Sequence, residues 1–132
     1  MFNGIIFYTG IIKSIKKEKK SCLISIKSNL KVRSKDIGSS ICCDGVCLTL
    51  SKIKSGLIFF YISNETLKRS TFSKARIGQI VNLEKSLVFG QKISGHFVQG
   101  HVDAVAKIKK VILIEKSWFL RLKLLKKSLN KF

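Results

Sequence analysis

Apolar and polar residues alternate along several short segments of the chain. Between residues 98 and 108 the even positions are small or apolar, whereas Gln99, His101, Asp103 and Lys107 occupy odd positions. Successive side chains of a β-strand point to opposite faces, so a period of two indicates a strand. The pattern predicts a strand with one packed face and one polar face.

The same criteria predict further short strands bounded by turn residues. The predicted strands cover residues 4–15, 22–27, 40–43, 46–54, 57–63, 80–85, 95–114 and 118–125. Residues 63–71 contain an N-cap candidate, Asn64, followed by an acidic residue, and predict one short helical turn. This density of strands favours an all-β fold, either a closed antiparallel barrel or a sandwich. We find no Pro/Ser-rich linker, low-complexity segment or internal repeat.

Composition is consistent with a single globular domain. The chain has 132 residues, of which 45% are hydrophobic, enough for one core. Its longest apolar run, residues 57–62, is far shorter than the roughly 18 residues that span a membrane. The amino terminus lacks basic residues before its short apolar stretch, unlike a secretory signal. We therefore expect a cytoplasmic protein with no membrane partner.

The net charge of +19 raises the hypothesis of nucleic-acid binding. However, the lysines are spread along the chain, and aromatic residues are not interleaved with them as stacking platforms. Only four of the 26 basic residues are arginine, the side chain favoured for base and bidentate phosphate contacts. Abundant Lys, Phe and Ile without Pro is the residue set that A/T-rich codons favour. Compositional drift is the simpler explanation, and we expect no specific nucleic-acid partner.

The four cysteines do not have the spacing of a zinc site or a disulfide framework. Cys42, Cys43 and Cys47 cluster around one turn, and Cys22 stands alone. The two histidines, at positions 96 and 101, are an odd number of residues apart, so a regular strand would send them to opposite faces. We expect no metal, reduced thiols, and Cys22 and Cys42 as small core residues.

Two segments carry candidate chemistry. Asp44–Gly45 is a strong turn signal, after which Val46 and Leu48 alternate with Cys47 and Thr49. A thiol and a hydroxyl therefore share a face that apolar residues do not occupy. His101 and Asp103 form a second such pair, beside glycines that leave room for a flat ligand. The alternative interpretation is a barrel strand whose polar face meets water.

Four sequence motifs occur in an order and spacing that identify a family. They are Gly-Val-Cys-Leu-Thr at 45–49, Glu-Thr-Leu-Lys-Arg-Ser-Thr at 65–71, Gly-Gln-Ile-Val-Asn-Leu-Glu at 78–84 and Gly-His-Phe-Val-Gln-Gly-His-Val-Asp at 95–103. Together with the opening Met-Phe-Asn-Gly-Ile-Ile, they resemble the amino-terminal barrel of the riboflavin synthase family. The resemblance spans nearly the whole chain.

The resemblance implies a closed six-stranded antiparallel Greek-key barrel with one short helical turn. It assigns residues 1–116 to a lumazine-binding barrel and residues 117–132 to a final strand and the start of a connection to a second barrel. Full-length members contain two barrels and form trimers. This chain therefore corresponds to the first barrel alone, as a fragment or a shortened product. We expect a homo-oligomer, for which a dimer is plausible with a single barrel.

The family's transferase reaction is the last step of riboflavin biosynthesis. It converts two molecules of 6,7-dimethyl-8-ribityllumazine into riboflavin and 5-amino-6-ribitylaminouracil and needs no cofactor. The enzyme holds two flat heterocycles face to face, and proton transfer at an acidic methyl group assists the reaction.

The resemblance also implies a set of substrate-binding residues. These residues are Gly4, Ile5, Ile6, Cys47, Leu48, Thr49, Tyr61, Ile62, Ser63, Asn64, Glu65, Thr66, His101, Val102 and Asp103. Thr49 and Thr66 are expected to bond ring or ribityl groups, and Ile6 and Val102 to supply apolar contact. Cys47 and His101 are expected nearest the reacting carbons as catalytic residues. His101 is the candidate proton carrier because imidazole exchanges protons near neutral pH, and Cys47 has the alternative role of a small wall residue.

The chain departs from the family pattern at two positions. Asn3 stands where the family usually has Thr, and Asp44 where it usually has Asn. Three hypotheses follow, in this order: a riboflavin synthase, a noncatalytic single-barrel lumazine- or flavin-binding protein, and a basic barrel that binds nucleic acid. Turnover of lumazine to riboflavin separates the first two.

Overall fold

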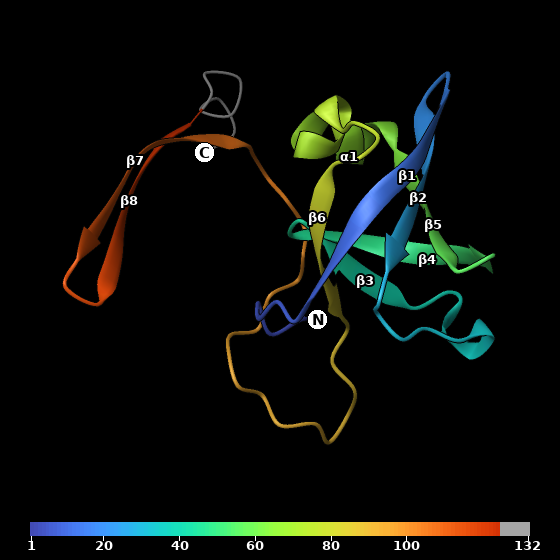
Figure 1. Cartoon of the computed structure of the whole chain (residues 1–132), viewed down its shortest axis with the longest axis horizontal. Coiled ribbons are helices and arrows are strands. Elements are labelled where there is room, and N and C mark those ends of the chain that lie inside the picture. Colours follow the sequence, from blue (N-terminus) through green and yellow to red (C-terminus); the bar gives the residue numbers. More distant parts are fainter. Residues whose placement is uncertain (125–132) are drawn as a thin grey trace.

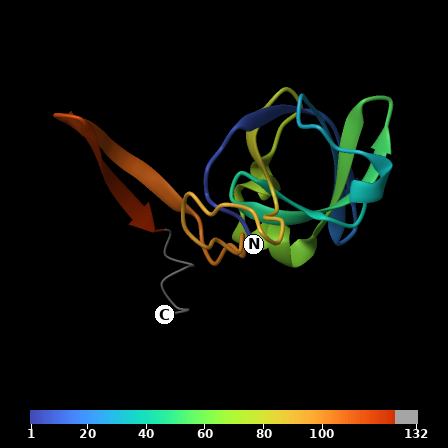
Figure 2. The ribbon, with the colours of Figure 1, turned by 90° about the horizontal axis from the view of Figure 1, so that it is seen from below.

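Six strands form a closed antiparallel barrel in the order β1-β2-β5-β4-β3-β6. The structure, a computed structural model, describes residues 1–124. The barrel strands are β1 (Tyr8–Glu18), β2 (Ser21–Ser28), β3 (Ser40–Cys43), β4 (Val46–Lys54), β5 (Leu57–Ser63) and β6 (Ile80–Lys85). Figure 2 looks into the barrel, and Figure 1 shows it from the side. The predicted all-β class and closed six-stranded antiparallel barrel are confirmed.

The barrel core follows the alternation within the strands. Ile41 and Cys43 on β3 point inward with Val46, Leu48 and Leu50 on β4, and all five are buried. The remaining core comes mainly from β2, β5 and β6, with Phe60 fully buried. Burying these apolar side chains supplies the main stabilisation of the fold.

Both cysteines predicted as core residues, Cys22 and Cys42, are buried. Cys22 packs in the core, as predicted. Cys42 is buried but does not belong to the core cluster, because Ile41 and Cys43 on either side of it point inward. The prediction that Cys42 is a small buried core residue is confirmed by its 4% exposure, although its side chain lies outside the main core cluster.

Helical structure is short in residues 1–124. It consists of α1 (Asn64–Arg69) and two 3₁₀ turns, η1 (Ser34–Asp36) and η2 (Thr71–Lys74). The N-cap of α1 is Ser63, one residue before the predicted cap Asn64, and its hydroxyl accepts from the Thr66 N–H at 3.2 Å. No helix in this part of the chain is long and apolar enough to cross a bilayer.

Two predicted strand boundaries are wrong, and each correction involves a glycine with positive φ. The first strand begins at Tyr8 rather than at residue 4, because Gly4 has a φ of 75°. The predicted strand over residues 95–114 is regular only in β7 (Ala106–Ile114). Upstream, Gly100 has a φ of 76°, and Val98 forms only an isolated bridge to Phe2. Positive φ is incompatible with a continuous strand.

A hairpin of β7 and β8 (Ser117–Leu124) forms a second, two-stranded sheet separate from the barrel. In Figure 1 it leads away from the barrel strands. Leu125, predicted as the end of this strand, lies outside the described residues, as does the rest of the predicted segment 117–132 beyond Leu124. The division at residue 116 stays a prediction, although β7 pairs with β8 in the hairpin and not with the barrel strands.

The barrel hairpin β1–β2 and the separate hairpin β7–β8 have the same turn length, bulge position and register. Shifting residue numbers by 96 maps the pair Glu18–Ser21 of β1–β2 onto Ile114–Ser117 of β7–β8. The same shift maps the register break between Ile12 and Ser14 onto the break between Ile108 and Lys110.

The correspondence continues upstream of the strands. Gly4 and Gly100 have the same positive φ, and the equivalent residues Phe2 and Val98 bridge to each other. The structure therefore shows a local correspondence that few identical residues reveal in the sequence.

Candidate ligand-binding site

A groove opens where the start of β4, the helix α1 and residues 100–102 meet. Its volume is about 180 Å³. The lining residues are Val46, Cys47, Glu65, Thr66, Arg69, Ser70, Gly100, His101 and Val102. The three segments are widely separated in the sequence, so the groove is a product of the tertiary fold.

A tight turn positions Cys47 in the groove. Asp44 and Gly45, with φ values of 46° and 82°, form the two-residue loop between β3 and β4. The Asp44 carboxylate accepts the Asn82 N–H at 2.7 Å, and the Asp44 N–H donates to the Asn82 carbonyl at 3.0 Å. These bonds attach the turn to β6. Asp44 therefore connects the turn to β6 through both its carboxylate and its main-chain N–H.

One main-chain hydrogen bond places the His101 segment against β4. The Cys47 N–H donates to the Gly100 carbonyl oxygen at 2.7 Å. A Cβ on Gly100 would lie 2.9 Å from both the Cβ and the main-chain nitrogen of Cys47, so the close approach requires glycine. Upstream, Phe2 and Val98 exchange two main-chain bonds of 2.8 and 3.0 Å. The amino-terminal segment therefore holds the strand-like residues that lead into His101.

A buried carboxylate anchors the amino-terminal segment. Glu84 on β6 is 8% exposed and accepts the N–H groups of Asn3 at 2.7 Å and Gly4 at 3.1 Å. Charge-assisted bonds of this kind are about twice as strong as neutral ones. Within residues 1–124, the buried Asn3 Oδ1 has no hydrogen-bond partner. The segment is therefore held through its main chain rather than through the Asn3 amide.

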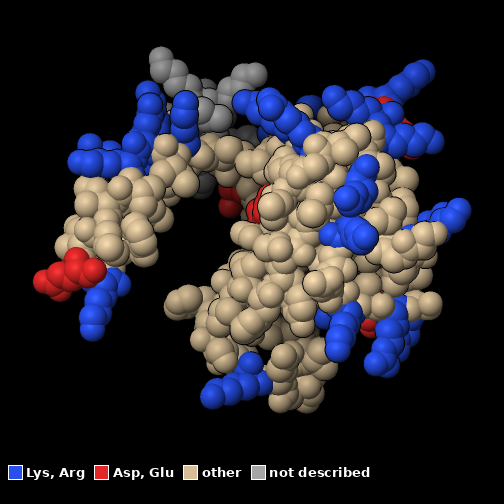
Figure 3. Space-filling view, viewed as in Figure 1, with Lys and Arg blue, Asp and Glu red and all other residues tan. Residues whose placement is uncertain are grey.

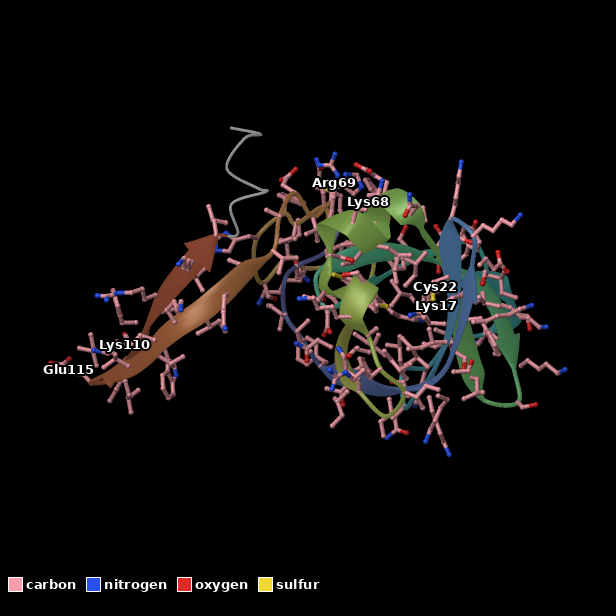
Figure 4. The ribbon with its side chains drawn as sticks, turned by 90° about the horizontal axis from the view of Figure 1, so that it is seen from above. Lys17, Cys22, Lys68, Arg69, Lys110 and Glu115 are labelled. Carbon is pink, nitrogen blue, oxygen red and sulfur yellow. The ribbon has the colours of Figure 1, made fainter. Side chains whose placement is uncertain are left out.

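The helix α1 gives the groove a polar wall. The Thr66 hydroxyl shares a hydrogen bond of 3.0 Å with the hydroxyl of the N-cap Ser63. Arg69 donates through Nε to the Glu65 carboxylate one turn away. Figure 4 shows Lys68 and Arg69 on this helix. The groove therefore combines hydroxyl, imidazole, thiol and paired charges with main-chain groups of residues 100–102.

The structure brings together part of the predicted site. Cys47, Glu65, Thr66, His101 and Val102 all line the groove. The other predicted residues do not line it: Gly4, Ile5, Ile6, Leu48, Thr49, Tyr61, Ile62, Ser63, Asn64 and Asp103. Leu48 and Ile62 point into the core, so their side chains cannot face a ligand in the groove.

Sequence reasoning missed four groove residues. Val46, Arg69, Ser70 and Gly100 also line the groove. Arg69 lies four positions after Glu65 and three after Thr66, a spacing that places the three residues on one helical face. That spacing was an available signal for Arg69. Gly100 is one of the glycines expected to leave room for a flat ligand beside the main chain.

Two larger hollows in the described part of the chain contain one predicted site residue between them, Asn64. One of about 370 Å³ is lined by residues 28–33 with Ile53, Gly56 and Ile58. Another of about 230 Å³ lies between β1, β2, α1 and η2, includes Asn64, and is rich in lysine. We favour the smaller groove because thiol, imidazole and hydroxyl groups converge there.

Burial governs the titration of three thiols. Burial, and then the neighbouring Glu84, raises the pKa of Cys42 to about 11. Burial likewise raises the pKa of Cys43 well above its usual value and, more weakly, that of Cys22, an effect opposed by Lys17 beside it (Figure 4). These three thiols are therefore protonated at neutral pH. In the described part of the chain, no three His, Cys, Asp or Glu side chains cluster closely enough to hold a metal.

The positive charge is spread over the surface. In Figure 3, Lys and Arg side chains cover separate parts of the visible face, over the barrel and the hairpin. Acidic side chains are few, consistent with a net charge of +19. No single basic stripe of the kind that tracks a phosphate backbone is visible on this face.

Comparisons with known proteins agree on one family. The family model of the lumazine binding domain matches residues 3–86 of this chain, which include all six barrel strands. The chain is 41% identical to riboflavin synthase of Photobacterium leiognathi over 109 residues, 82% of this chain and 50% of that protein. It is 41% identical to that of Chlamydia muridarum over 118 residues, 89% of this chain and 58% of that protein. The chain spans about half the length of these curated relatives.

Solved structures resemble the chain over nearly its whole length. LumP complexed with 6,7-dimethyl-8-(1'-D-ribityl) lumazine superposes with a TM-score of 0.77 and 25% identity, covering 96% of this chain and 70% of that one. LumP complexed with flavin mononucleotide gives a TM-score of 0.70 and 27% identity, covering 94% and 67%. From its barrel, its matched residues and these relatives, the chain belongs to the lumazine binding domain family and resembles the amino-terminal barrel of riboflavin synthases.

Proposed function

We propose that the groove binds 6,7-dimethyl-8-ribityllumazine and that the barrel acts in the riboflavin synthase reaction. The observation that carries this proposal is the convergence of Cys47, Thr66 and His101 on one groove from three separate segments. A pteridine ligand needs a flat slot, main-chain groups along the ring edge and polar groups for its ribityl chain. The glycine at position 100 and the polar wall of α1 supply these features.

The proposed roles follow the position of each side chain. His101 carries the proton that leaves or enters the reacting methyl group, and Cys47 lies beside it as a second candidate for contact with the reacting carbons. Thr66 bonds the ring edge or a ribityl hydroxyl, and Val102 contacts the ring. We retain Thr49, Ile6 and the other predicted residues, except the core residues Leu48 and Ile62, as outer contacts that a bound ligand would reach beyond the groove.

The size of the groove supports a shared site. At about 180 Å³ it is smaller than the roughly 300–1,000 Å³ of typical ligand pockets. One barrel therefore encloses only part of a ligand, and a second surface would supply the opposite wall. Because the reaction joins two lumazines, two facing barrels from an oligomer or a longer chain would bring both substrates together.

The hairpin supports the same picture. In β1–β2, Ile12, Ile24 and Ile26 are buried in the barrel. Their counterparts in β7–β8 under the 96-residue shift are Ile108, Leu120 and Leu122, which are 59%, 52% and 58% exposed. We infer that β7–β8 is the opening hairpin of a second, similar barrel.

The second candidate function is noncatalytic binding of lumazine or flavin. Its support is the structural likeness to LumP, whose solved complexes contain a ribityl lumazine or a flavin. Such a protein would bind the same ligand in the same groove and release it unchanged.

Steady-state turnover of 6,7-dimethyl-8-ribityllumazine by the purified chain separates the two functions. Formation of riboflavin supports the enzyme, whereas fluorescence changes without product support the binder. His101→Ala tests the proposed proton transfer in an active chain. It should lower kcat by about 10²–10⁴-fold with a smaller effect on ligand affinity. An equal loss of turnover and affinity would show that His101 only shapes the groove.

A further inference from the structure

Cys42 and Cys47 lie directly opposite each other on the neighbouring strands β3 and β4. A strand residue directs its N–H and C=O to the same side, and the Cys47 N–H donates to Gly100 instead of β3. The Asp44 N–H, two positions after Cys42, likewise donates away from β4, to Asn82 on β6. Cys42 and Cys47 are therefore a non-hydrogen-bonded pair, the closer of the two antiparallel pairings.

Both thiols are on the outer face of the barrel wall. Their sequence neighbours Ile41, Cys43 and Val46 pack in the core, whereas Cys42 lies outside the core cluster and Cys47 lines the groove. Opposite residues on one face of a non-hydrogen-bonded pair have Cα atoms about 4.5 Å apart and Cβ atoms about 4.5–5.5 Å apart. The Cα separation lies within the range of about 4.4–6.8 Å that disulfides span. Only a small approach of the two Cβ atoms is then needed.

We propose that Cys42 and Cys47 are a redox-active dithiol that closes to a disulfide at the floor of the groove. Both are free thiols in the structure. The other two cysteines do not share this arrangement, because Cys22 and Cys43 point into the core. The family resemblance and the comparisons assign no such pair.

Hydrogen peroxide is an oxidant that balances the reaction. The Cys47 sulfur attacks one peroxide oxygen and becomes a sulfenic acid, releasing one water. The Cys42 sulfur then attacks the Cys47 sulfur, forms the S–S bond and expels the sulfenic oxygen as a second water. The two thiols lose two protons and two electrons, which reduce one peroxide to two waters. Cys47 makes the first attack because it is the more exposed thiol and burial raises the pKa of Cys42.

Closure would change the groove. The bond draws the Cys47 sulfur toward β3, away from the space it shares with His101 and Thr66. The effect on ligand binding rests on the proposed function, whereas formation of the disulfide does not. We expect the oxidised chain to bind 6,7-dimethyl-8-ribityllumazine at least fivefold more weakly than the reduced chain.

The first experiment counts thiols in the intact chain before and after treatment with hydrogen peroxide. The number of free thiols per chain should fall from four to two. The mass measured under non-reducing conditions should be that of one chain less two hydrogen atoms. Digestion with trypsin and an Asp-specific protease cuts before Asp44, so a Cys42–Cys47 bond joins the fragments 36–43 and 44–52. Four remaining thiols, sulfinic acid without a disulfide, or a disulfide between two chains would overturn the proposal.

Matched variants identify the thiols without relying on one substitution. Cys42→Ala and Cys47→Ala should both abolish the internal disulfide, whereas Cys22→Ala and Cys43→Ala should retain it. If Cys43→Ala prevents closure and Cys42→Ala does not, the assignment is wrong. Because the fragment 36–43 also contains Cys43, tandem mass spectrometry of the linked wild-type peptides must assign the bond to Cys42 or Cys43, and it does so even if a variant fails to fold.

The second experiment compares lumazine affinity in reduced chain, oxidised chain and oxidised chain treated again with dithiothreitol. A fall in affinity that dithiothreitol reverses supports coupling between the dithiol and the groove. If the disulfide forms but lumazine affinity is unchanged, the dithiol stands and the coupling fails. If the reduced chain does not bind lumazine at all, the proposed function fails while the thiol experiment still decides the disulfide.

Discussion

The Cys47 N–H donates to the Gly100 carbonyl oxygen at 2.7 Å, joining two residues 53 positions apart in the sequence. Cys47 is the second residue of β4, and Gly100 directly precedes His101. This contact decides which polar side chains can meet in the groove. Without it, the segment that carries His101 has no main-chain bond to β4 within residues 1–124.

Gly100→Ala should disrupt the groove more than Gly90→Ala, which is a matched control. Both glycines have positive φ, 76° and 81°, but a Cβ at Gly90 would meet no atom within 4 Å. The shared backbone strain should cost each variant about 1 kcal/mol. Crowding against Cys47 should cost Gly100→Ala about 1–3 kcal/mol more. Chemical denaturation measures both free energies of unfolding, and equal losses would show that the segment adjusts without strain.

Thr66→Val should weaken lumazine binding about five- to tenfold, because losing one hydrogen bond costs roughly 1 kcal/mol of binding free energy. Thr49→Val on β4 is the comparison, because Thr49 is exposed but does not line the groove. Fluorescence titration with 6,7-dimethyl-8-ribityllumazine measures both affinities. A larger loss in Thr49→Val would place the ligand farther along β4 than we propose.

Asp36→Asn should destabilise the fold in a pH-dependent way. The Arg33 N–H donates to the Asp36 carboxylate at 2.8 Å and lowers its pKa, with help from Lys85 at 3.5 Å. Because the folded pKa is below the unfolded value of about 4, the contribution is complete above that value and is lost as pH falls through the folded pKa.

Urea denaturation at pH 7 and at about pH 3 measures this effect. The stability difference between the native chain and Asp36→Asn should shrink at the lower pH. A difference that stays constant would mean that the variant acts through packing of the η1 turn and not through charge.

Replacing Leu120 and Leu122 with lysine should reduce self-association of the chain. Both leucines are exposed on β8, as parts of an apolar surface that has no covering element within residues 1–124. Lys123→Gln on the same strand is the control. Light scattering over a range of concentrations measures the mass, and unchanged association in the double variant would exclude this face as the contact.

The local sequence determined much of the barrel. Residues 40–43, 46–54, 57–63 and 80–85 form strands with the predicted bounds. In these segments alternating side chains and turn residues such as Asp44–Gly45 lie next to one another, so short-range patterning suffices. The N-cap pattern in residues 63–71 also predicted the short helix that carries Thr66, although the cap itself is Ser63.

Only the tertiary structure decided the course of residues 95–105, the outward position of Cys42 and the separation of the hairpin from the barrel. A period of two shows that a strand has two faces, but not which partner covers each face. At Gly100 a positive φ and a single bond to Cys47 replace the predicted strand. The sequence by itself therefore determined the strands and the family, whereas contacts between distant segments decided which side chains meet in the groove, because those contacts depend on barrel closure.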